Sequence, residues 1–417
     1  MVMILGMAMV KSTSPMVPSF VDKIAARLDW ARRMAIGGLT IAAAITLWHG
    51  TVTLTAGTTP DIALSLDPGN VRANAASADQ SLAQSDLESA TIASRRALIR
   101  SPAAPSAVRS LGLAASLSKR QDAASAAFRY ANILSRRDLG TNLWFIEFAV
   151  AQNNVDAALH RYDIALRTSS SAYATLFPIL TGVLDDSEYV TPIVRVLTAN
   201  PPWTQNFLEY AFNTKTPPLD LARLGQSLAQ NGKALPNDLE RMLVERLALA
   251  GEYDAAWQAY LRLKPNSTFT KRGVRDEELV DRQPSALFDW QYANTGESIA
   301  MPQSKDRPTQ FRSFAEQPVS VLSQLLLLLP GNYAILAPTH ITTGTSRPRW
   351  ILSCVTDNRI LGEVIASTST ALTKFAFVDV NCRAQWLRLI VQGTAMAPTE
   401  GKLHSVKLVR LGSTVNR

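Results

Sequence analysis

The pattern of apolar and polar residues divides the chain into an apolar run, a helical stretch and a strand-rich end. Residues 34–56 contain no Asp, Glu, Lys or Arg. From 61 to 265, apolar residues recur at helical spacings, which predicts amphipathic helices. Polar and charged residues without that periodicity fill 266–285, a predicted linker. Short apolar runs bounded by Gly, Pro and Asn, such as "RWILSCV" and "QWLRLIVQG", predict strands in 286–417.

These patterns together predict an α+β multidomain chain. It would consist of a single N-terminal transmembrane helix, an α-solenoid of helical hairpins and a C-terminal antiparallel β-sandwich of the jelly-roll kind. The solenoid is expected to be irregular after residue 170, where Pro201-Pro202 and Pro217-Pro218 interrupt the helical spacing.

The apolar run is long enough to cross a bilayer as a helix. Arg32 and Arg33 precede it, and the first charge after it is Asp61. The positive-inside rule then places residues 1–33 in the cytoplasm and the rest of the chain outside. A buried core helix and a cleaved signal peptide are the alternatives. Cleavage after Ala56 is disfavoured, because Leu54 would occupy a position that prefers a small residue.

Turn signals recur in the helical stretch every thirty-four residues, at Pro68, Pro102 and Arg136. The same interval relates small, bulky and small residues on successive predicted second helices. These are Ala124, Phe128 and Ala131, then Ala158, Tyr162 and Ala165, and earlier Ala90, Ser94 and Ala97, with Ser94 where a bulky residue is expected. With the pair Leu111-Gly112, this pattern resembles tetratricopeptide (TPR) repeats over residues 61–170. The repeats are degenerate, because the first-helix aromatic positions hold Asn74, Val108 and Asn142.

The TPR resemblance implies a concave helical face that binds a protein partner. On the family's groove-facing positions the matched residues are Arg72, Asp79, Arg109 and Glu147. These four side chains are candidates for contacting a partner. The alternative is that each is ordinary solvated helix surface.

The strand-rich region contains the only two cysteines, Cys354 and Cys382. Alternation places both on apolar faces of different strands, and the predicted topology places them in an oxidising compartment. We therefore expect a disulfide, with two buried free thiols as the alternative. A metal site is not expected, because the two cysteines lack nearby paired histidines.

The C-terminal region resembles, in texture only, the β-sandwich modules that bind carbohydrate. In "QWLRLIVQG" the core face is expected to hold Leu387, Leu389 and Val391, so Trp386 and Arg388 would point to solvent. An exposed Trp beside an Arg can stack on a sugar ring and hydrogen-bond its hydroxyls. Coverage of Trp386 by the solenoid is the alternative.

Charge and motifs limit the classes of function. The net charge of +8 lies at the two ends, which leaves residues 34–329 at about −1 and disfavours a nucleic-acid groove. No nucleophile elbow, phosphate-binding loop or metal-ligand motif is present, so we expect no catalytic residues, no metal and no cofactor.

The sequence therefore predicts a non-catalytic scaffold or adaptor, anchored by one helix in a bacterial inner membrane with its bulk in the periplasm. Its partners would be proteins of an envelope complex, one that makes or exports a surface polysaccharide. The bacterial assignment rests on an Ala- and Arg-rich composition and on the resemblance. A carbohydrate-binding protein is the second hypothesis, and an envelope enzyme with a cleft between its domains is the third.

Overall fold

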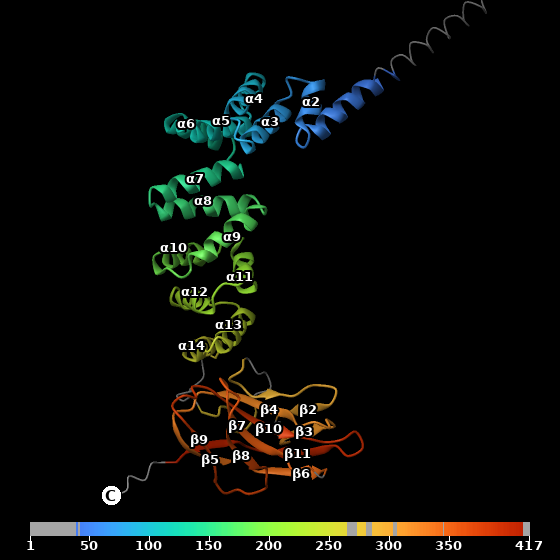
Figure 1. Ribbon diagram of the computed structural model, residues 1–417, viewed down its shortest axis with the longest axis vertical. Helices are drawn as coiled ribbons and strands as arrows, with labels where there is room; N and C mark the ends of the chain where they lie inside the picture. The colour runs from blue at the N-terminus through green and yellow to red at the C-terminus, as the bar shows by residue number, and fades with distance from the viewer. Residues whose placement is uncertain are drawn as a thin grey trace, which may run out of the picture. The chain divides into compact units, whose positions relative to one another are not determined.

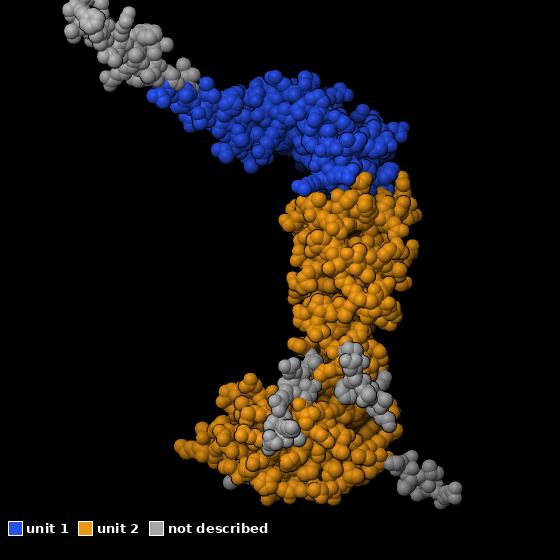
Figure 2. Space-filling model, turned by 180° about the vertical axis from the view of Figure 1, so that it is seen from behind, with its two compact units in different colours: residues 1–148 blue, residues 149–417 orange. Residues whose placement is uncertain are grey.

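The computed structural model describes residues 39–40, 42–264, 273–280, 286–302, 307–344 and 346–411 (Figure 1). The predicted cytoplasmic segment 1–33 lies outside the described residues. The chain forms two compact units, Met1–Phe148 and Ala149–Arg417 (Figure 2), and each is described by itself.

The first described element is a helix over residues 42–55. Most of its side chains are exposed, but Val52 and Ala56 are buried against Ala63 of the next helix. The last turn of the predicted span therefore packs on the helical unit. Among the described residues, no helix combines the length and the apolarity that a membrane span requires, and residues 34–38 of the predicted span are not among those described.

The first unit is built from antiparallel helical hairpins. Its helices are α2 (Pro60–Leu66), α3 (Val71–Ala83), α4 (Leu87–Arg100), α5 (Pro105–Leu117), α6 (Gln121–Leu134) and α7 (Leu139–Ala151), which runs past the unit boundary. Successive first helices begin at Val71, Pro105 and Leu139, an interval of thirty-four residues. The predicted TPR-like repeat is confirmed at the level of helix boundaries.

Local sequence explains where these helices begin and turn. The side chains of Asn70 and Asp86 cap α3 and α4 by accepting hydrogen bonds from backbone N–H groups one turn ahead. A left-handed residue stands at each hairpin turn: Ser85, Lys119 and Asn153, with φ of 61°, 59° and 54°. These three positions are again thirty-four residues apart, so the same turn repeats with three different side chains.

The core of this unit is rich in alanine. Ala124 and Ala131 of α6 are fully buried and flank Phe128, which is also fully buried. The ring of Phe128 stacks on Trp144 at 4.2 Å between centroids, and a Cβ on Gly112 would come within 3.0 Å of it. The small-bulky-small pattern therefore marks the positions where one ring fills the space that neighbouring alanines leave.

The second unit continues the hairpins and adds the sandwich. Its helices are α8 (Val155–Thr168), α9 (Ala172–Gly182), α10 (Ser187–Thr198), α11 (Thr204–Asn213), α12 (Pro218–Gln230), α13 (Asn237–Leu249) and α14 (Tyr253–Leu263). Pro178 and Pro192 lie inside α9 and α10, where the strict interval is lost. The predicted irregular continuation of the solenoid is confirmed.

The sandwich consists of two antiparallel sheets (Figure 1). The larger sheet has the order β1-β4-β10-β7-β8-β9-β5-β12 and the smaller β2-β3-β11-β6. Their strands are β1 (Gln291–Tyr292), β2 (Ser298–Met301), β3 (Thr309–Ser313), β4 (Val319–Leu326), β5 (Gly331–Leu336), β6 (Thr339–Thr343), β7 (Arg349–Cys354), β8 (Ile360–Ile365), β9 (Thr373–Val378), β10 (Gln385–Val391), β11 (Thr399–Leu403) and β12 (Lys407–Arg410). Inward-facing residues of both sheets form one core around Trp290 and Trp350.

The described part of the predicted linker, residues 273–280, is not a solvated connector. Arg275 and Leu279 within it are buried, and Leu279 belongs to the sandwich core. The linker prediction is therefore wrong over these residues. Arg275 is buried against aromatic rings, but a charged residue does not contribute to apolar periodicity. The hydrophobic pattern of the sequence therefore could not indicate its burial.

Candidate functional site

An apolar groove of about 540 Å³ opens in the second unit, between the tips of neighbouring helical hairpins. The end of α7 and the start of α8 form one wall, and the end of α9 and the start of α10 form the other. Three apolar side chains remain exposed there: Val150 at 58%, Ile179 at 50% and Tyr189 at 36%. The lining is completed by the apolar residues Val155, Ala158, Leu159, Tyr162, Leu180, Val183 and Ile193 and by the polar residues Asn153, Asn154 and Glu188.

One acidic residue, Glu188, lines this groove, and two more precede it in the α9–α10 turn. Asp185, Asp186 and Glu188 are all exposed around the α9–α10 turn. The carboxylate of Asp186 accepts a hydrogen bond from the backbone N–H of Glu188 at 2.8 Å, which caps α10. Burial at the groove floor raises the pKa of Tyr162, so its hydroxyl stays protonated. The groove therefore offers apolar walls beside a negative edge.

The sequence did not point to this groove. Its apolar residues follow the ordinary helical spacing of the repeats, which does not separate them from core residues. Only the exposure of Ile179 and Tyr189 distinguishes them from buried residues such as Leu180, and exposure depends on how consecutive hairpins stack.

Arg109, predicted to contact a partner, forms an internal clamp between hairpins. Its guanidinium donates to Asp79 of α3 and to Asp138 ahead of α7, each at 2.6 Å. Ser110 also donates its hydroxyl hydrogen bond to Asp79. Gly140 leaves room for the arginine, since a Cβ there would lie 2.5 Å from its Cδ. Two of the predicted partner contacts, Arg109 and Asp79, are thus paired with each other and join successive repeats.

The other two candidates on the helical face lie apart from this tie. Arg72 is exposed near Gly57, at a shallow hollow that Asp67 and Arg100 also line. Glu147 is exposed on α7. Both are accessible to a partner.

Trp386 and Arg388 lie on the outer face of β10, as the alternation predicts. Leu387, Leu389 and Val391 point into the core and are at most 1% exposed. Both outer residues are half-buried, and the guanidinium of Arg388 lies over the Trp386 ring at 5.3 Å from its centroid. Burial lowers the pKa of Arg388. The pair is formed, and part of the indole face is already occupied by the arginine.

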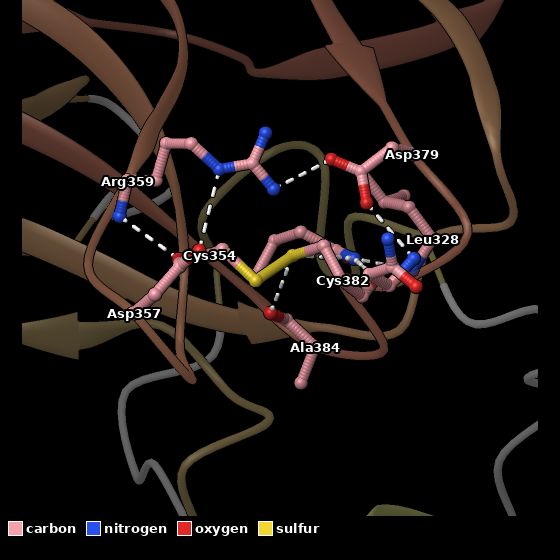
Figure 3. The surroundings of a disulfide bond; sticks show 9 residues. Leu328, Cys354, Asp357, Arg359, Asp379, Cys382 and Ala384 are labelled. Carbon is pink, nitrogen blue, oxygen red and sulfur yellow. Dashed lines mark hydrogen bonds and ion pairs between the residues drawn. A yellow bond between two sulfur atoms is a disulfide. The ribbon is translucent and has the colours of Figure 1, made fainter.

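The predicted disulfide between Cys354 and Cys382 is formed and buried (Figure 3). It joins the end of β7 to the turn after β9. Nearby, Arg359 donates to Asp379 at 2.6 Å and to Asp357 at 3.3 Å, which ties the same two segments a second time (Figure 3).

The last helical hairpin joins the sandwich through Arg275. Its buried guanidinium lies 4.7 Å from the ring centroids of both Trp257 and Tyr260 on α14 and 5.0 Å from that of Phe288. Burial lowers its pKa to about 10, against the attraction of Asp289. Lys264 also pairs with Asp289, at 3.6 Å.

No metal-binding cluster of three or more His, Cys, Asp or Glu occurs within the described residues. No known family model and no curated protein sequence matches this chain.

Several solved structures show a likeness to parts of the chain. One, reported as the functional characterization of Pseudomonas aeruginosa pilF, is 16% identical, with a TM-score of 0.25, over 47% of this chain and 93% of that one. PilW, reported as a widely conserved type IV pilus biogenesis factor, is 16% identical, with a TM-score of 0.24, over 47% and 93%. TmCBM61 in complex with β-1,4-galactotriose is 17% identical, with a TM-score of 0.22, over 34% and 97%.

Proposed function

We propose that this protein is a non-catalytic scaffold or adaptor of a bacterial envelope complex, and that the groove between its hairpin tips holds a protein partner. The observation that carries this proposal is the exposed apolar lining of the groove, Val150, Ile179 and Tyr189, beside an acidic edge. Exposed apolar surface rimmed by polar residues is typical of protein-binding sites.

Charge defines the partner more closely. With Glu188 in its lining, and Asp185 and Asp186 exposed in the turn just before it, the groove favours a segment that carries an apolar side chain next to a Lys or Arg. An amphipathic helix of a second protein meets this requirement, because it can seat the apolar residue between the hairpin tips and present the basic residue to the acidic edge.

The test begins with a photo-crosslinking amino acid at Ile179 in the full-length protein, in the cells that make it. The crosslinked partner is then purified and titrated against the full-length chain and two variants. Ile179→Asp should weaken binding about tenfold or more, because it places a charge in the apolar groove. Leu249→Asp, at a residue 86% exposed on α13, is the matched control and should leave binding unchanged. Equal binding by both variants would exclude the groove as the docking site.

Anchoring by the N-terminal apolar run is part of the same proposal. The helix over 42–55 exposes Leu47 at 72% and Leu54 at 80%, which are costly in water and suited to lipid. An inner-membrane anchor with the hairpins and sandwich in the periplasm also fits a formed disulfide, since disulfides persist in oxidising compartments.

Glycan binding by the sandwich is a second candidate, favoured by the outward position of Trp386 beside Arg388. If this pair stacks on sugar, Trp386→Ala should abolish glycan retention by the full-length protein. The stability cost should be well below the ~3–5 kcal/mol of a core Trp, because the ring is half-buried.

The control is Trp350→Ala, which truncates a core ring 1% exposed and should show the full loss of stability. Retention of glycan by a folded Trp386→Ala variant would assign the ring a purely structural role. Affinity chromatography on immobilised polysaccharides and thermal melting measure the two effects.

A further inference from the structure

Two helices of the first unit carry a regular row of exposed isoleucines and arginines. On α4 the outward positions hold Arg95, Arg96 and Ile99, and on α6 they hold Arg129 and Ile133. We call these five residues the arginine–isoleucine face. Ile99 is 81% exposed and Ile133 is 76% exposed.

The two rows occupy equivalent positions of successive repeats. Arg95 and Arg129 occupy the same position of successive repeats, as do Ile99 and Ile133, thirty-four residues apart. Tyr130, exposed on α6, donates its hydroxyl hydrogen bond at 3.3 Å to the carbonyl of Pro102, just past the end of α4. The tyrosine thereby links α6 to the turn that follows α4.

The face is strongly cationic. Residues 87–137 contain nine Lys and Arg against two acidic residues, although the central part of the chain as a whole is nearly neutral. In the part of the chain that the structure describes, neither Arg95, Arg96 nor Arg129 has a carboxylate within 4.0 Å. Arg109 in the same unit, by contrast, pairs with two aspartates.

The next repeat uses the same positions differently. Thirty-four residues after Arg129 and Ile133 of α6, the equivalent positions of α8 hold Asp163 and Arg167. These two residues pair with each other at 2.8 Å. The outer positions are thus internally neutralised in α8, while on α4 and α6 the described residues offer Arg95, Arg96 and Arg129 no ion-pair partner and leave the isoleucines exposed.

We propose that the arginine–isoleucine face docks on a membrane surface that carries anionic lipid headgroups. Guanidinium groups bind phosphate oxygens bidentately, and isoleucines between them can enter the boundary between headgroups and acyl chains. The unit also begins with the exposed apolar helix over 42–55, which brings it to a bilayer if the proposed anchor is correct. The inference rests on that anchor only for proximity. A purely acidic protein would satisfy the arginines but give the isoleucines no apolar environment.

The test places a polarity-sensitive fluorophore at Ile133→Cys in the full-length chain. The native cysteines are joined in the Cys354–Cys382 disulfide, so the new thiol is the one that reacts. The labelled protein is reconstituted in vesicles of phosphatidylcholine alone or mixed with phosphatidylglycerol. The matched control carries the label at Arg167→Cys, the equivalent position of the next repeat.

The emission of the label at position 133 should shift to the blue in vesicles that contain phosphatidylglycerol and not in neutral ones, and the label at 167 should not respond. Replacing Arg95, Arg96 and Arg129 by Gln should weaken docking on the order of 100-fold, about fivefold for each arginine, and high salt should act in the same direction. Equal emission in both kinds of vesicle would overturn the proposal. So would a shift that soluble polyglutamate or DNA produces and anionic vesicles do not.

Flotation separates this proposal from the anchor. Neutral vesicles report the anchor alone, because they offer the arginines no net charge. If the chain floats only with anionic vesicles, the anchor is wrong and the face is supported. If it floats with both and the label does not respond, the anchor stands and the face is wrong.

Discussion

Ser94 occupies the position that Phe128 and Tyr162 fill in the following repeats. Its side chain is completely buried, and its hydroxyl finds no hydrogen-bond partner among the residues that the structure describes. An unpaired buried hydroxyl carries a desolvation cost without any compensating bond. The hairpin of α3 and α4 therefore packs around a small polar residue where later repeats have an aromatic ring.

We expect Ser94→Ala to leave the stability unchanged or to raise the free energy of unfolding by up to about 1 kcal/mol, because it removes the unpaired hydroxyl. Ser94→Phe should destabilise by about 1–3 kcal/mol, since no space remains for the ring. Chemical denaturation of both variants checks this. Stabilisation by the phenylalanine would mean that the hairpin holds an unfilled cavity.

Asn74 and Asn142 make the same hydrogen bonds in two repeats, although neither matches the TPR consensus. Asn74 and Asn142 are buried at first-helix positions where TPR repeats have an aromatic residue. Each donates from its Nδ2 to two backbone carbonyls, one in the preceding turn and one at the start of its own helix, at 2.9–3.0 Å. Each asparagine thus fixes the entry of the chain into its hairpin by hydrogen bonds instead of ring packing.

At the scale of elements, a buried ion pair between Glu240 and Arg262 joins α13 to α14. Glu240 is 4% exposed and accepts a hydrogen bond from Nε of Arg262 at 2.9 Å. Burial raises the pKa of Glu240 above its ordinary value of 4.5, and the guanidinium only partly opposes this. The folded state therefore holds the Glu240 proton more tightly than the unfolded state.

This shift gives the stability a defined dependence on pH. The contribution of Glu240 to the free energy of unfolding should be complete at low pH and should fall as the pH rises above about 4.5. The difference between the wild type and Glu240→Gln, measured by denaturation at several pH values, should decrease over that range. Glu245→Gln, on the exposed side of the same helix, controls for the loss of a carboxylate. If the stability difference between the wild type and Glu240→Gln did not change with pH, Glu240 would have the same pKa in the folded and the unfolded state.

The disulfide acts at the scale of strands, because it closes a segment of 28 residues between β7 and the turn after β9. Replacing Cys354 and Cys382 together by Ala should lower the free energy of unfolding by roughly 3–4 kcal/mol on the chain-entropy model. In the wild-type protein, unfolded without a reductant, Cys354 and Cys382 should both resist alkylation. Full labelling without a reductant would mean that the bond does not form in the natural compartment.

At the scale of the whole molecule, orientation in the membrane is the main prediction. Arg32 and Arg33 precede the apolar run, and no charge follows it until Asp61. Reporter fusions after residues 30 and 120 should therefore report opposite sides of the membrane, with the second one outside. A cytoplasmic signal from the second fusion would contradict both the anchor and the assigned compartment.

Part of this protein was determined by the sequence alone. The thirty-four-residue interval, the sandwich and the core face of β10 all follow from side-chain periodicity, because helices and strands repeat their faces at fixed spacings. The disulfide was also predicted, although only Cys354 lies on a strand: β9 ends at Val378, and Cys382 is buried in the turn that follows it. Such features depend on neighbours along the chain, and the structure contains them with nearly the predicted boundaries.

The tertiary structure decided which polar residues are available and which are not. Arg109, a predicted partner contact, ties its own hairpin to the hairpins before and after it, because its aspartates lie about thirty residues away on either side. Arg275 looked like linker and is buried among three aromatic rings. The groove at Ile179 and the row of Arg95 and Ile99 also depend on which surfaces the stacked hairpins leave uncovered. Pairing and exposure are properties of residues brought together from distant parts of the chain, so no local pattern in the sequence could specify them.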